Sequence, residues 1–306
     1  MNDLISLFDL TAEDFENIFT LSARLKKDLK QGLPHQILKG KTLGMIFSKS
    51  STRTRVSFEV GMYQLGGYPL FLSSSDIQLG RGETIYDTAV VLSRYISGIM
   101  IRTFKHSDVV DLARHGSIPV INGLTDLMHP CQILADLFTV IEAKGKLKGL
   151  KMAYVGDGNN VANSLLHGCA KIGMDITVAT PKGYGCDAGI IEEAKSDAAK
   201  SGCKLVLTED PFEAAANADV IYTDTWVSMG QEAEKEIRVK TFLPYQVNSK
   251  LFSHAKSDAI FLHCLPAYRG MEVTEEIIDG PHSAVFDEAE NRLHVQKAIM
   301  ALLMED

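Results

Sequence analysis

The stretch LGMIFSKSSTRTRV, residues 43–56, joins two kinds of hydrophobic pattern. Its first five residues form a short apolar run without alternation, which is typical of a strand buried on both faces. From Val56 apolar residues recur at helical spacing, until Gly66-Gly67 ends the pattern. A buried strand that runs directly into a helix predicts an α/β fold with a parallel sheet.

The rest of the chain repeats this alternation. An amphipathic helix is expected at about 11–30, and apolar runs separated by helix-length segments follow in two series. The predicted strands are 43–47, 68–72, 98–102, 118–121, 151–155, 175–179, 204–207, 219–223 and 259–264. We expect two domains, each a mostly parallel sheet covered by helices, joined by interdomain helices. The basic, glycine-punctuated stretch 144–149 marks the crossing between them.

The composition narrows the classes of function. The chain has 306 residues and a net charge of -8, which argues against binding to nucleic acid or to an anionic membrane. Five cysteines are dispersed without a C-x-x-C pair, which is typical of a reducing cytosol. The start of the chain has no signal-peptide pattern, and no apolar run reaches the length of a membrane span. We therefore expect a cytoplasmic protein. If it binds an anion, it has to do so through a local cluster of Arg side chains and backbone N–H groups.

Such a cluster lies between the first strand and the helix that follows it. Residues 51–55 read STRTR, so hydroxyls and arginines stand where a helix begins, at the carboxyl end of a strand. Free N–H groups and the helix dipole favour anions there, and Arg is a bidentate donor for phosphate. The alternative is a Ser or Thr cap with solvated arginines. The helix itself shows two apolar stripes, which predicts burial on both sides. The two stripes are Val56, Val60, Tyr63 and Phe58, Met62, Leu65.

Two more groups of polar residues stand at element ends in the first half. Arg102 ends a predicted strand, where ligands of open α/β sheets bind, although alone it would more often form a surface ion pair. The sequence His129-Pro130-Cys131-Gln132 begins a helix and offers an imidazole and an amide that could polarise a carbonyl group. A lone His at such a place is usually a cap.

The second half contains a glycine turn that resembles a nucleotide-binding turn. Strand 151–155 runs into Gly156-Asp157-Gly158-Asn159-Asn160, so a nicotinamide-dependent oxidoreductase has to be considered. However, Val161 stands where the third glycine belongs, and the next strand ends without the acidic residue that would hold a ribose. The turn instead offers side-chain amides for a carboxylate or another polar substrate.

Two further strand ends carry reactive groups. Asp224 follows strand 219–223 and precedes Trp226, Ser228 and Met229, so it could bind an ammonium group or only cap the next turn. Cys264 lies at the end of strand 259–264, where a thiol could position or deprotonate an amine, although most cysteines simply pack.

Taken together, these motifs resemble the aspartate/ornithine carbamoyltransferase family. They stand in the family's order and spacing over essentially the whole chain. The matching motifs are 51–55, Arg102, 129–132, Asp224 with 228–230, and 263–266. The resemblance implies a carbamoyl phosphate-binding domain, residues 1–143 with the terminal helix 288–306 packed back on it, and an ornithine-binding domain, residues 144–287. It also implies a homo-oligomer, expected to be a trimer with shared active sites, and a cis Leu265–Pro266 bond.

The resemblance further assigns site residues. The catalytic ones are Arg102, His129 and Cys264. The residues for carbamoyl phosphate are Ser51, Thr52, Arg53, Thr54, Gln78 from a neighbouring subunit, Arg102, His129, Gln132, Cys264, Leu265 and Arg292. The residues for ornithine are Asn160, Asp224, Ser228 and Met229.

The choice of acceptor follows from one departure within the family. The aspartate enzymes place a lysine in the loop before the strand that ends at Arg102, but residues 50–104 contain no lysine. The resemblance therefore implies transfer of a carbamoyl group from carbamoyl phosphate to the δ-amine of ornithine, giving citrulline and phosphate in arginine metabolism. Attack of the neutral amine needs no metal or organic cofactor, and the charged loop at 230–240 is expected to close over the substrates. Putrescine or N-acetylornithine as acceptor, and a non-catalytic binding subunit, remain as alternatives.

Overall fold

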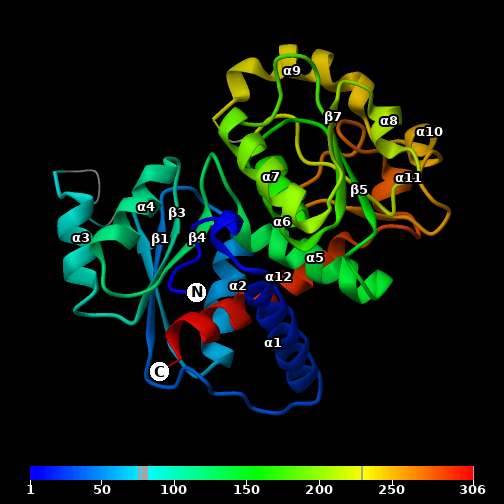
Figure 1. Ribbon diagram of the computed structural model, residues 1–306. Helices are drawn as coiled ribbons and strands as arrows, with labels where there is room; N and C mark the ends of the chain where they lie inside the picture. Colours follow the sequence, from blue (N-terminus) through cyan, green and yellow to red (C-terminus); the bar gives the residue numbers. More distant parts are fainter. Residues whose placement is uncertain (75–76, 78–81, 229, 306) are drawn as a thin grey trace. The chain divides into compact units, whose positions relative to one another are not determined.

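The computed structural model describes residues 1–74, 77, 82–228 and 230–305, and it contains two parallel sheets (Figure 1). The four-stranded sheet has the order β2-β1-β3-β4, and the five-stranded sheet has the order β7-β6-β5-β8-β9. Every strand pair is parallel. The predicted fold class, two domains with mostly parallel, helix-covered sheets, is confirmed.

One compact unit consists of Met1–Leu134 and Asn291–Asp306. In the sheet of this unit Phe47 lies opposite Ser73 on one side and Arg102 on the other, so three strands end at one level. The chain that follows β1 and the side chain of Arg102 therefore share one edge. The elements are η1 (Leu7–Asp9), α1 (Ala12–Lys30), β1 (Thr42–Phe47), α2 (Thr52–Gln64), β2 (Tyr68–Ser73), α3 (Ile85–Leu92), β3 (Gly98–Arg102), α4 (His106–His115) and β4 (Val120–Leu124).

The other compact unit consists of Ala135–Glu290. Tyr154 lies opposite Tyr222, which lies opposite Leu262, so β5, β8 and β9 also end together. The segments that follow them carry the glycine turn, Asp224 and Cys264. The elements are β5 (Lys151–Val155), α6 (Asn160–Ile172), β6 (Asp175–Ala179), α7 (Ala188–Ser201), β7 (Leu205–Thr208), α8 (Pro211–Ala215), β8 (Val220–Tyr222), η2 (Glu232–Glu234), α9 (Lys235–Phe242), η3 (Leu243–Tyr245), α10 (Ser249–Phe252), β9 (Ile260–Leu262) and α11 (Glu275–Ile278).

The division into units falls inside two helices, α5 (Pro130–Lys144) and α12 (Val285–Met304). The last residues of α12 belong to the first unit, where they pack against α2: a Cβ added at Gly61 would lie 3.1 Å from Met300 and 3.2 Å from Lys297. The domain limits predicted at 143/144 and 287/288 stay predictions, because a division of contacts inside a continuous helix does not fix a functional boundary.

Helix α2 corrects one prediction. The stripe formed by Phe58, Met62 and Leu65 is fully buried, as expected. The other stripe is not buried within the chain, because Val56 is 50%, Val60 37% and Tyr63 75% exposed. A helix with two apolar sides buries both of them only when a partner covers each side, so the sequence pattern did not reveal that one partner is missing from a single chain.

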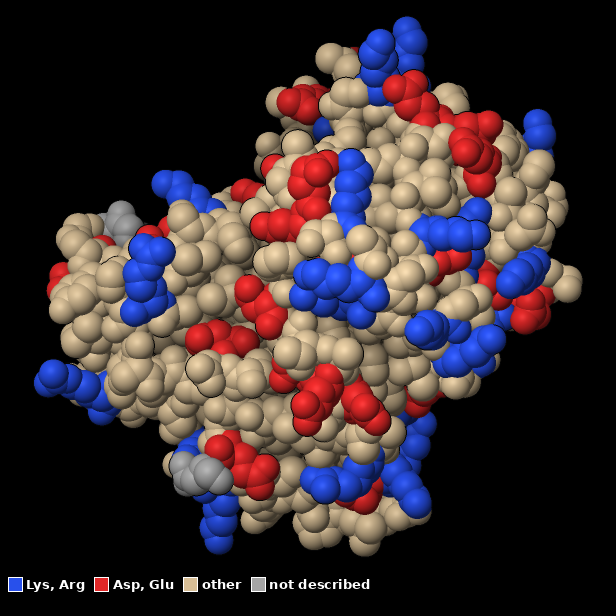
Figure 2. All heavy atoms as spheres, in the orientation of Figure 1, with Lys and Arg blue, Asp and Glu red and all other residues tan. Residues whose placement is uncertain are grey.

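The surface carries charges of both signs. On the face that Figure 2 shows, Lys and Arg are interspersed with Asp and Glu. Among the described residues, no helix is both long enough and apolar enough to cross a membrane.

Candidate active site

The predicted anion cluster lies at the first turn of α2, as the sequence led us to expect. Ser51 is the N-cap, with extended backbone at φ -164°, and its Oγ accepts a hydrogen bond from the Thr54 amide at 3.2 Å. Thr52, Arg53 and Thr54 are therefore helical, and the remaining N–H groups of this turn point out of the helix start. Of the hydroxyl groups in residues 51–54, only that of Ser51 caps the helix.

Two buried guanidinium groups converge on Thr54. Arg102 Nη1 lies 3.5 Å from the Thr54 hydroxyl oxygen, and Arg292 Nη2 donates to the same oxygen at 3.0 Å. Arg102 is 6% and Arg292 4% exposed. The two guanidinium groups share one hydroxyl acceptor and are shielded from solvent, so their positive charges repel each other. An anion bound beside them would offset that repulsion.

The start of α5 adds a neutral imidazole and an amide to this cluster. Gln132 Oε1 accepts from Arg292 Nη1 at 2.8 Å, and His129 is 4% exposed. Burial lowers the pKa of His129 well below its ordinary value, and the charges of Arg292, Arg102 and Arg53 lower it further. The ring is therefore neutral at physiological pH, and a neutral imidazole can donate one N–H without adding charge. The structure thus brings Thr54, Arg102, His129, Gln132 and Arg292 together.

Lys49 is a residue of this edge that the sequence reasoning did not single out. Its ammonium group pairs with Asp126 and lies 4.3 Å from the centre of the Phe104 ring, while the side chain is only 7% exposed. The position of Lys49 two residues before the motif 51–55 was visible in the sequence, but nothing there distinguished it from a solvated lysine. The structure shows a lysine held in place directly before the anion cluster.

In the second unit the glycine turn packs tightly against Gly185, and one of its two side-chain amides is used in hydrogen bonds within the protein. A Cβ at Gly158 would lie 2.3 Å from the backbone carbon of Gly185, so only glycine fits there. Asn159 caps α6, with its Oδ1 accepting from the amides of Val161 and Ala162, and its Nδ2 donates to Asp224 at 2.7 Å. The expectation that the Asn159 amide is available to a substrate is therefore wrong: this side chain positions the helix and Asp224.

Asp224 and Cys264 form the reactive pair of this unit. The thiol of Cys264 donates to Asp224 Oδ1 at 3.0 Å, and the Thr225 amide donates to the same oxygen at 2.8 Å. Burial raises the pKa of Cys264 well above its ordinary value, and the nearby charge of Asp224 raises it further. At neutral pH the group is a thiol that donates to a carboxylate, not a thiolate.

Donor atoms of Asp224, His263 and Cys264 all lie within 4.8 Å of one another, a grouping that could hold a metal ion. Both ring nitrogens of His263 already have hydrogen-bond partners, Leu265 at 2.9 Å and Glu272 at 3.2 Å. A metal ion bound there would have to break one of these bonds. The Leu265–Pro266 bond is cis, as the resemblance implied.

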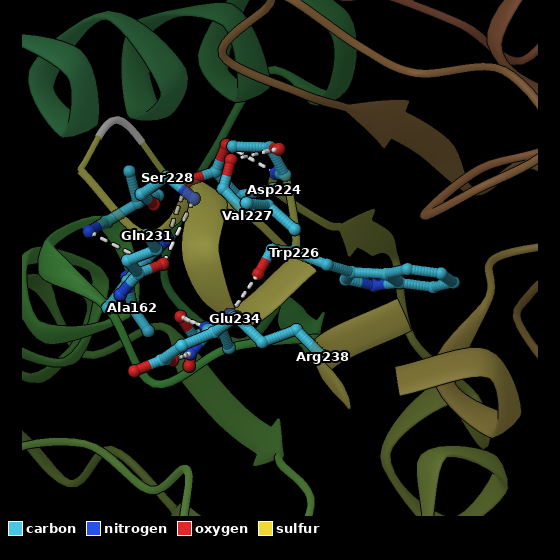
Figure 3. A network of polar contacts seen from close by, with 12 residues as sticks. Ala162, Asp224, Trp226, Val227, Ser228, Gln231, Glu234 and Arg238 are labelled. Atoms are coloured by element: carbon cyan, nitrogen blue, oxygen red, sulfur yellow. Dashed lines mark hydrogen bonds and ion pairs between the residues drawn. The ribbon is translucent and has the colours of Figure 1, made fainter. Parts of the chain in front are cut away.

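The segment after Asp224 is anchored by Arg238 (Figure 3). Arg238 Nε donates to the Trp226 carbonyl at 2.6 Å, and Arg238 Nη2 pairs with Asp157 of the glycine turn. The Trp226 indole points away from Ser228, and its ring lies over Phe242 with centroids 6.1 Å apart. The Ser228 amide donates to Gln231 Oε1 at 3.0 Å. The segment 230–240, expected to be a loop, is mostly helical, because η2 and α9 occupy it.

Two predicted site residues, Gln78 and Met229, lie outside the described part of the chain. Asn160, the first residue of α6, and Ser228, two residues after Trp226, are both half-buried. Arg238 and Asp157 were missed by the sequence reasoning. No signal pointed to Arg238, because one arginine in a charged segment usually faces solvent.

These features define a class: a protein of two α/β units, one with buried arginines at a strand–helix junction, which suit an anion, and one with a carboxylate beside a thiol, which suit an amine. Comparison with protein families narrows the class. Residues 2–142 match the carbamoyl-P binding domain of aspartate/ornithine carbamoyltransferase, and residues 148–303 match its Asp/Orn binding domain. The chain belongs to the aspartate/ornithine carbamoyltransferase family. The oxidoreductase alternative has no support from these matches.

Individual relatives agree over nearly the full length. The chain is 62% identical to an ornithine carbamoyltransferase of Carboxydothermus hydrogenoformans, covering 99% of this chain and 97% of that protein. Its structure is similar to that of ornithine carbamoyltransferase from Pyrococcus furiosus, with a TM-score of 0.97, 57% identity, and coverage of 99% and 97%. It is also similar to anabolic ornithine carbamoyltransferase from Campylobacter jejuni, with a TM-score of 0.92, 45% identity, and coverage of 99% of both chains.

Proposed function

We propose that this enzyme transfers the carbamoyl group of carbamoyl phosphate to the δ-amino group of L-ornithine, giving L-citrulline and phosphate. The observation that carries the proposal is the convergence of Arg102 and Arg292 on Thr54 at the start of α2. In a chain of this family, such a cluster suits the phosphate and carbonyl oxygens of carbamoyl phosphate. The ornithine carbamoyltransferases to which the chain is similar support the choice of acceptor.

In the proposed carbamoyl phosphate site, the α2 start and the arginines divide the work. The backbone and hydroxyls of Ser51, Thr52 and Thr54, together with Arg53, bind phosphate oxygens. Gln78 of a neighbouring subunit would complete this part. Thr54, Arg102 and His129 donate to the carbonyl oxygen, and each such donor can contribute about 3 kcal/mol to transition-state stabilisation. The remaining contacts to the carbamoyl group are assigned to Gln132, Cys264, Leu265 and Arg292.

In the proposed ornithine site, Asp224 supplies the anion for an amino group. Its carboxylate is oriented by Asn159 and Thr225, so it cannot turn away from a bound amine. Asn160, Ser228 and Met229 are assigned to the amino-acid end of ornithine. Recognition of that end disfavours putrescine, which has no carboxylate, and N-acetylornithine, whose α-nitrogen is not basic.

The proposed chemistry is a nucleophilic acyl substitution. The neutral δ-nitrogen attacks the carbonyl carbon, the C=O electron pair moves to oxygen, and the negative charge formed there is stabilised by the donors around Thr54. Collapse of this intermediate breaks the C–O bond to phosphate and leaves the ureido group of citrulline. Most of the acceleration comes from holding two reactants in line.

The δ-nitrogen loses one proton in this reaction, and a group has to accept it. Burial and the Asp224 charge raise the pKa of Cys264, so this thiol already carries a proton at neutral pH and cannot act as the base. We therefore assign the proton to the departing phosphate, which gains negative charge as the C–O bond breaks. Cys264 then orients Asp224 and the amine.

The proposal also includes the oligomeric state of the enzyme, its cellular location and its metabolic role. The exposed apolar stripe of α2, Val56, Val60 and Tyr63, supports a homo-oligomer, which we propose is a trimer with shared active sites. Five free cysteines support a cytoplasmic location. The similarity to an enzyme described as anabolic supports a role in arginine biosynthesis rather than breakdown.

The proposal is tested by assaying citrulline and phosphate after mixing the protein with carbamoyl phosphate and ornithine. Equal turnover with putrescine, N-acetylornithine or aspartate would refute the acceptor assignment. Arg53→Ala should weaken binding of carbamoyl phosphate, whereas Asp224→Asn should weaken binding of ornithine, each measured by titration calorimetry. The reverse pattern would mean that the roles of the two clusters are exchanged.

A further inference from the structure

His263 stands between strand β9 and Cys264. The side chain is fully buried, as is that of Glu272. Its Nδ1 lies 2.9 Å from the Leu265 amide, and its Nε2 lies 3.2 Å from Glu272 Oε1. Because an amide can only donate, Nδ1 is the acceptor and the ring proton is on Nε2, which donates to Glu272.

Two glutamate side chains hold this residue, Glu272 at its ring and Glu288 at its backbone amide. Glu272 Oε1 also accepts from the Tyr268 amide at 2.6 Å, so it ties the imidazole to the chain beyond the turn. On the other side, the His263 amide donates to Glu288 Oε2 at 2.9 Å. The hydroxyl of Tyr222 lies 3.4 Å from the other oxygen of Glu288. Ring and backbone of His263 are therefore both held, and the ring is not free to rotate.

These contacts hold Leu265 in an unusual backbone conformation. Leu265 has φ 56°, in the left-handed region that side chains other than glycine rarely adopt. Such a conformation persists only where the surroundings determine it. The hydrogen bond from the Leu265 amide to His263 Nδ1 joins the strained residue to the fixed ring across Cys264.

We propose that His263 is a positioning residue: its neutral imidazole, oriented by Glu272, fixes Leu265 and thereby aims the Cys264 thiol and the Cys264–Leu265 backbone at the reacting groups. The inference rests on the proposed function, because it takes this turn to be part of the site for carbamoyl transfer. It predicts that the Nδ1 bond matters for turnover, and that the Nε2 bond matters only by orienting the ring.

Two substitutions separate the two bonds of the ring. In His263→Asn, the amide oxygen takes the place of Nδ1 and still accepts from Leu265, while the bond to Glu272 is lost. In His263→Gln, the amide nitrogen takes the place of Nε2 and still donates to Glu272, while Leu265 loses its acceptor. We expect His263→Asn to keep kcat within about tenfold of wild type and His263→Gln to lose about a hundredfold, since misplacement of reacting groups by about 1 Å has that effect.

A change in folding alone would not produce this split. The midpoint temperature of thermal unfolding should be lowered to a similar extent in the two variants, because each loses one buried hydrogen bond. Their kcat values should nevertheless differ. Equal loss of kcat in the two variants, or wild-type kcat in both, would overturn the inference. If neither variant folds, Glu272→Gln decides the matter: its amide oxygen still accepts from His263 and Tyr268, so kcat should stay within about threefold. A hundredfold loss in Glu272→Gln would contradict the neutral, oriented ring.

Wild-type activity distinguishes a failure of the positioning role from a failure of the proposed function. Citrulline formation by wild type together with equal His263 variants would refute the positioning role and leave the proposed function intact. If wild type forms no citrulline, the proposed function and this inference both fail.

Discussion

Cys264 is the residue whose chemistry depends most on its surroundings. Burial and the adjacent Asp224 carboxylate keep its pKa well above the ordinary value for a thiol. The thiolate fraction at pH 8 should therefore be small, and alkylation should be at least about tenfold slower than for a model thiol, since each pKa unit is a factor of ten. Mass spectrometry of the Cys264 peptide after iodoacetamide treatment measures this rate.

The sign of the pH dependence makes this prediction specific. Because only the thiolate reacts, the labelling rate should keep rising through pH 9, where a model thiol begins to level off. Asp224→Asn removes the charge that raises the pKa, so it should increase the labelling rate at pH 8. A rate for wild type that levels off below pH 9 would contradict a raised pKa.

At this scale the sequence allowed some residues to be placed together and not others. Asp224 and Cys264 follow parallel strands, and parallel strands end at one edge, so their proximity could be predicted. The contacts of Arg292 with Thr54 and Gln132 could not, because periodicity leaves open where the last helix packs. The hydrogen bonds of His263 depend on a left-handed Leu265, which no sequence pattern marks.

At the scale of elements, the turn between β5 and α6 works only with glycine at its centre. Gly158→Ala would bring a Cβ to 2.3 Å from the backbone of Gly185, so one of the two segments has to move. We expect a loss of about 1–3 kcal/mol in the free energy of unfolding. The KM for ornithine should rise as well, because Asn159 and its bond to Asp224 would shift.

Gly185 offers the matched control for this change. A Cβ there has Thr180 Oγ1 at 4.0 Å as its nearest neighbour, so Gly185→Ala should leave stability and KM nearly unchanged. Urea unfolding and steady-state kinetics measure both effects. Equal behaviour of the two variants would show that the close approach does not matter.

The anchoring of α9 through Arg238 gives a second prediction at this scale. Arg238→Met removes a buried cation from Asp157, and breaking a buried pair from one side costs about 3 kcal/mol of stability. Arg269→Met is the control: it breaks the exposed pair with Asp279, where solvent weakens the attraction, so its effect should be much smaller.

The stability change in Arg238→Met should depend on pH. Burial raises the pKa of Asp157 to about 6, against the lowering effect of the Arg238 charge, so without Arg238 the pKa rises further. A carboxyl group with a raised pKa in the folded state lowers the free energy of unfolding as pH rises from its unfolded to its folded pKa, and has no further effect above that. Wild type therefore stops losing stability from this group near pH 6, whereas the variant continues to lose it at higher pH. The loss in the variant relative to wild type should therefore be small at pH 5 and larger at pH 8. A loss of equal size at both values would contradict a charge effect.

Helices and strands were predicted well where a single apolar pattern, packed against one neighbouring layer of the same chain, determines them. Strands 98–102, 151–155 and 175–179 have the expected bounds, because buried parallel strands are continuous apolar runs. The segment 230–240 was wrongly expected as a loop, since a polar helix of eight residues shows little periodicity. The exposed stripe of α2 was wrongly expected to be buried.

At the scale of the whole molecule, that stripe leads to a prediction about assembly. Val60→Asp places a carboxylate in the middle of the stripe, where an interface would have to bury it unpaired. The variant should have a lower mass than wild type in light scattering at equal concentration, and lower activity if sites are shared. Ile237→Asp, on the exposed side of α9, is the control and should keep the wild-type mass. A monomeric wild type would contradict the proposed oligomer.

The central claim is that a carbamoyl group moves to the δ-nitrogen of ornithine. The most direct measurement uses ¹³C-labelled carbamoyl phosphate with ornithine labelled with ¹⁵N at the δ position, and records the ¹³C spectrum of the product. We predict a ureido carbon split by one-bond coupling to ¹⁵N, formed together with an equal amount of phosphate. A labelled product without that coupling, or phosphate release without any ureido carbon, would contradict the account.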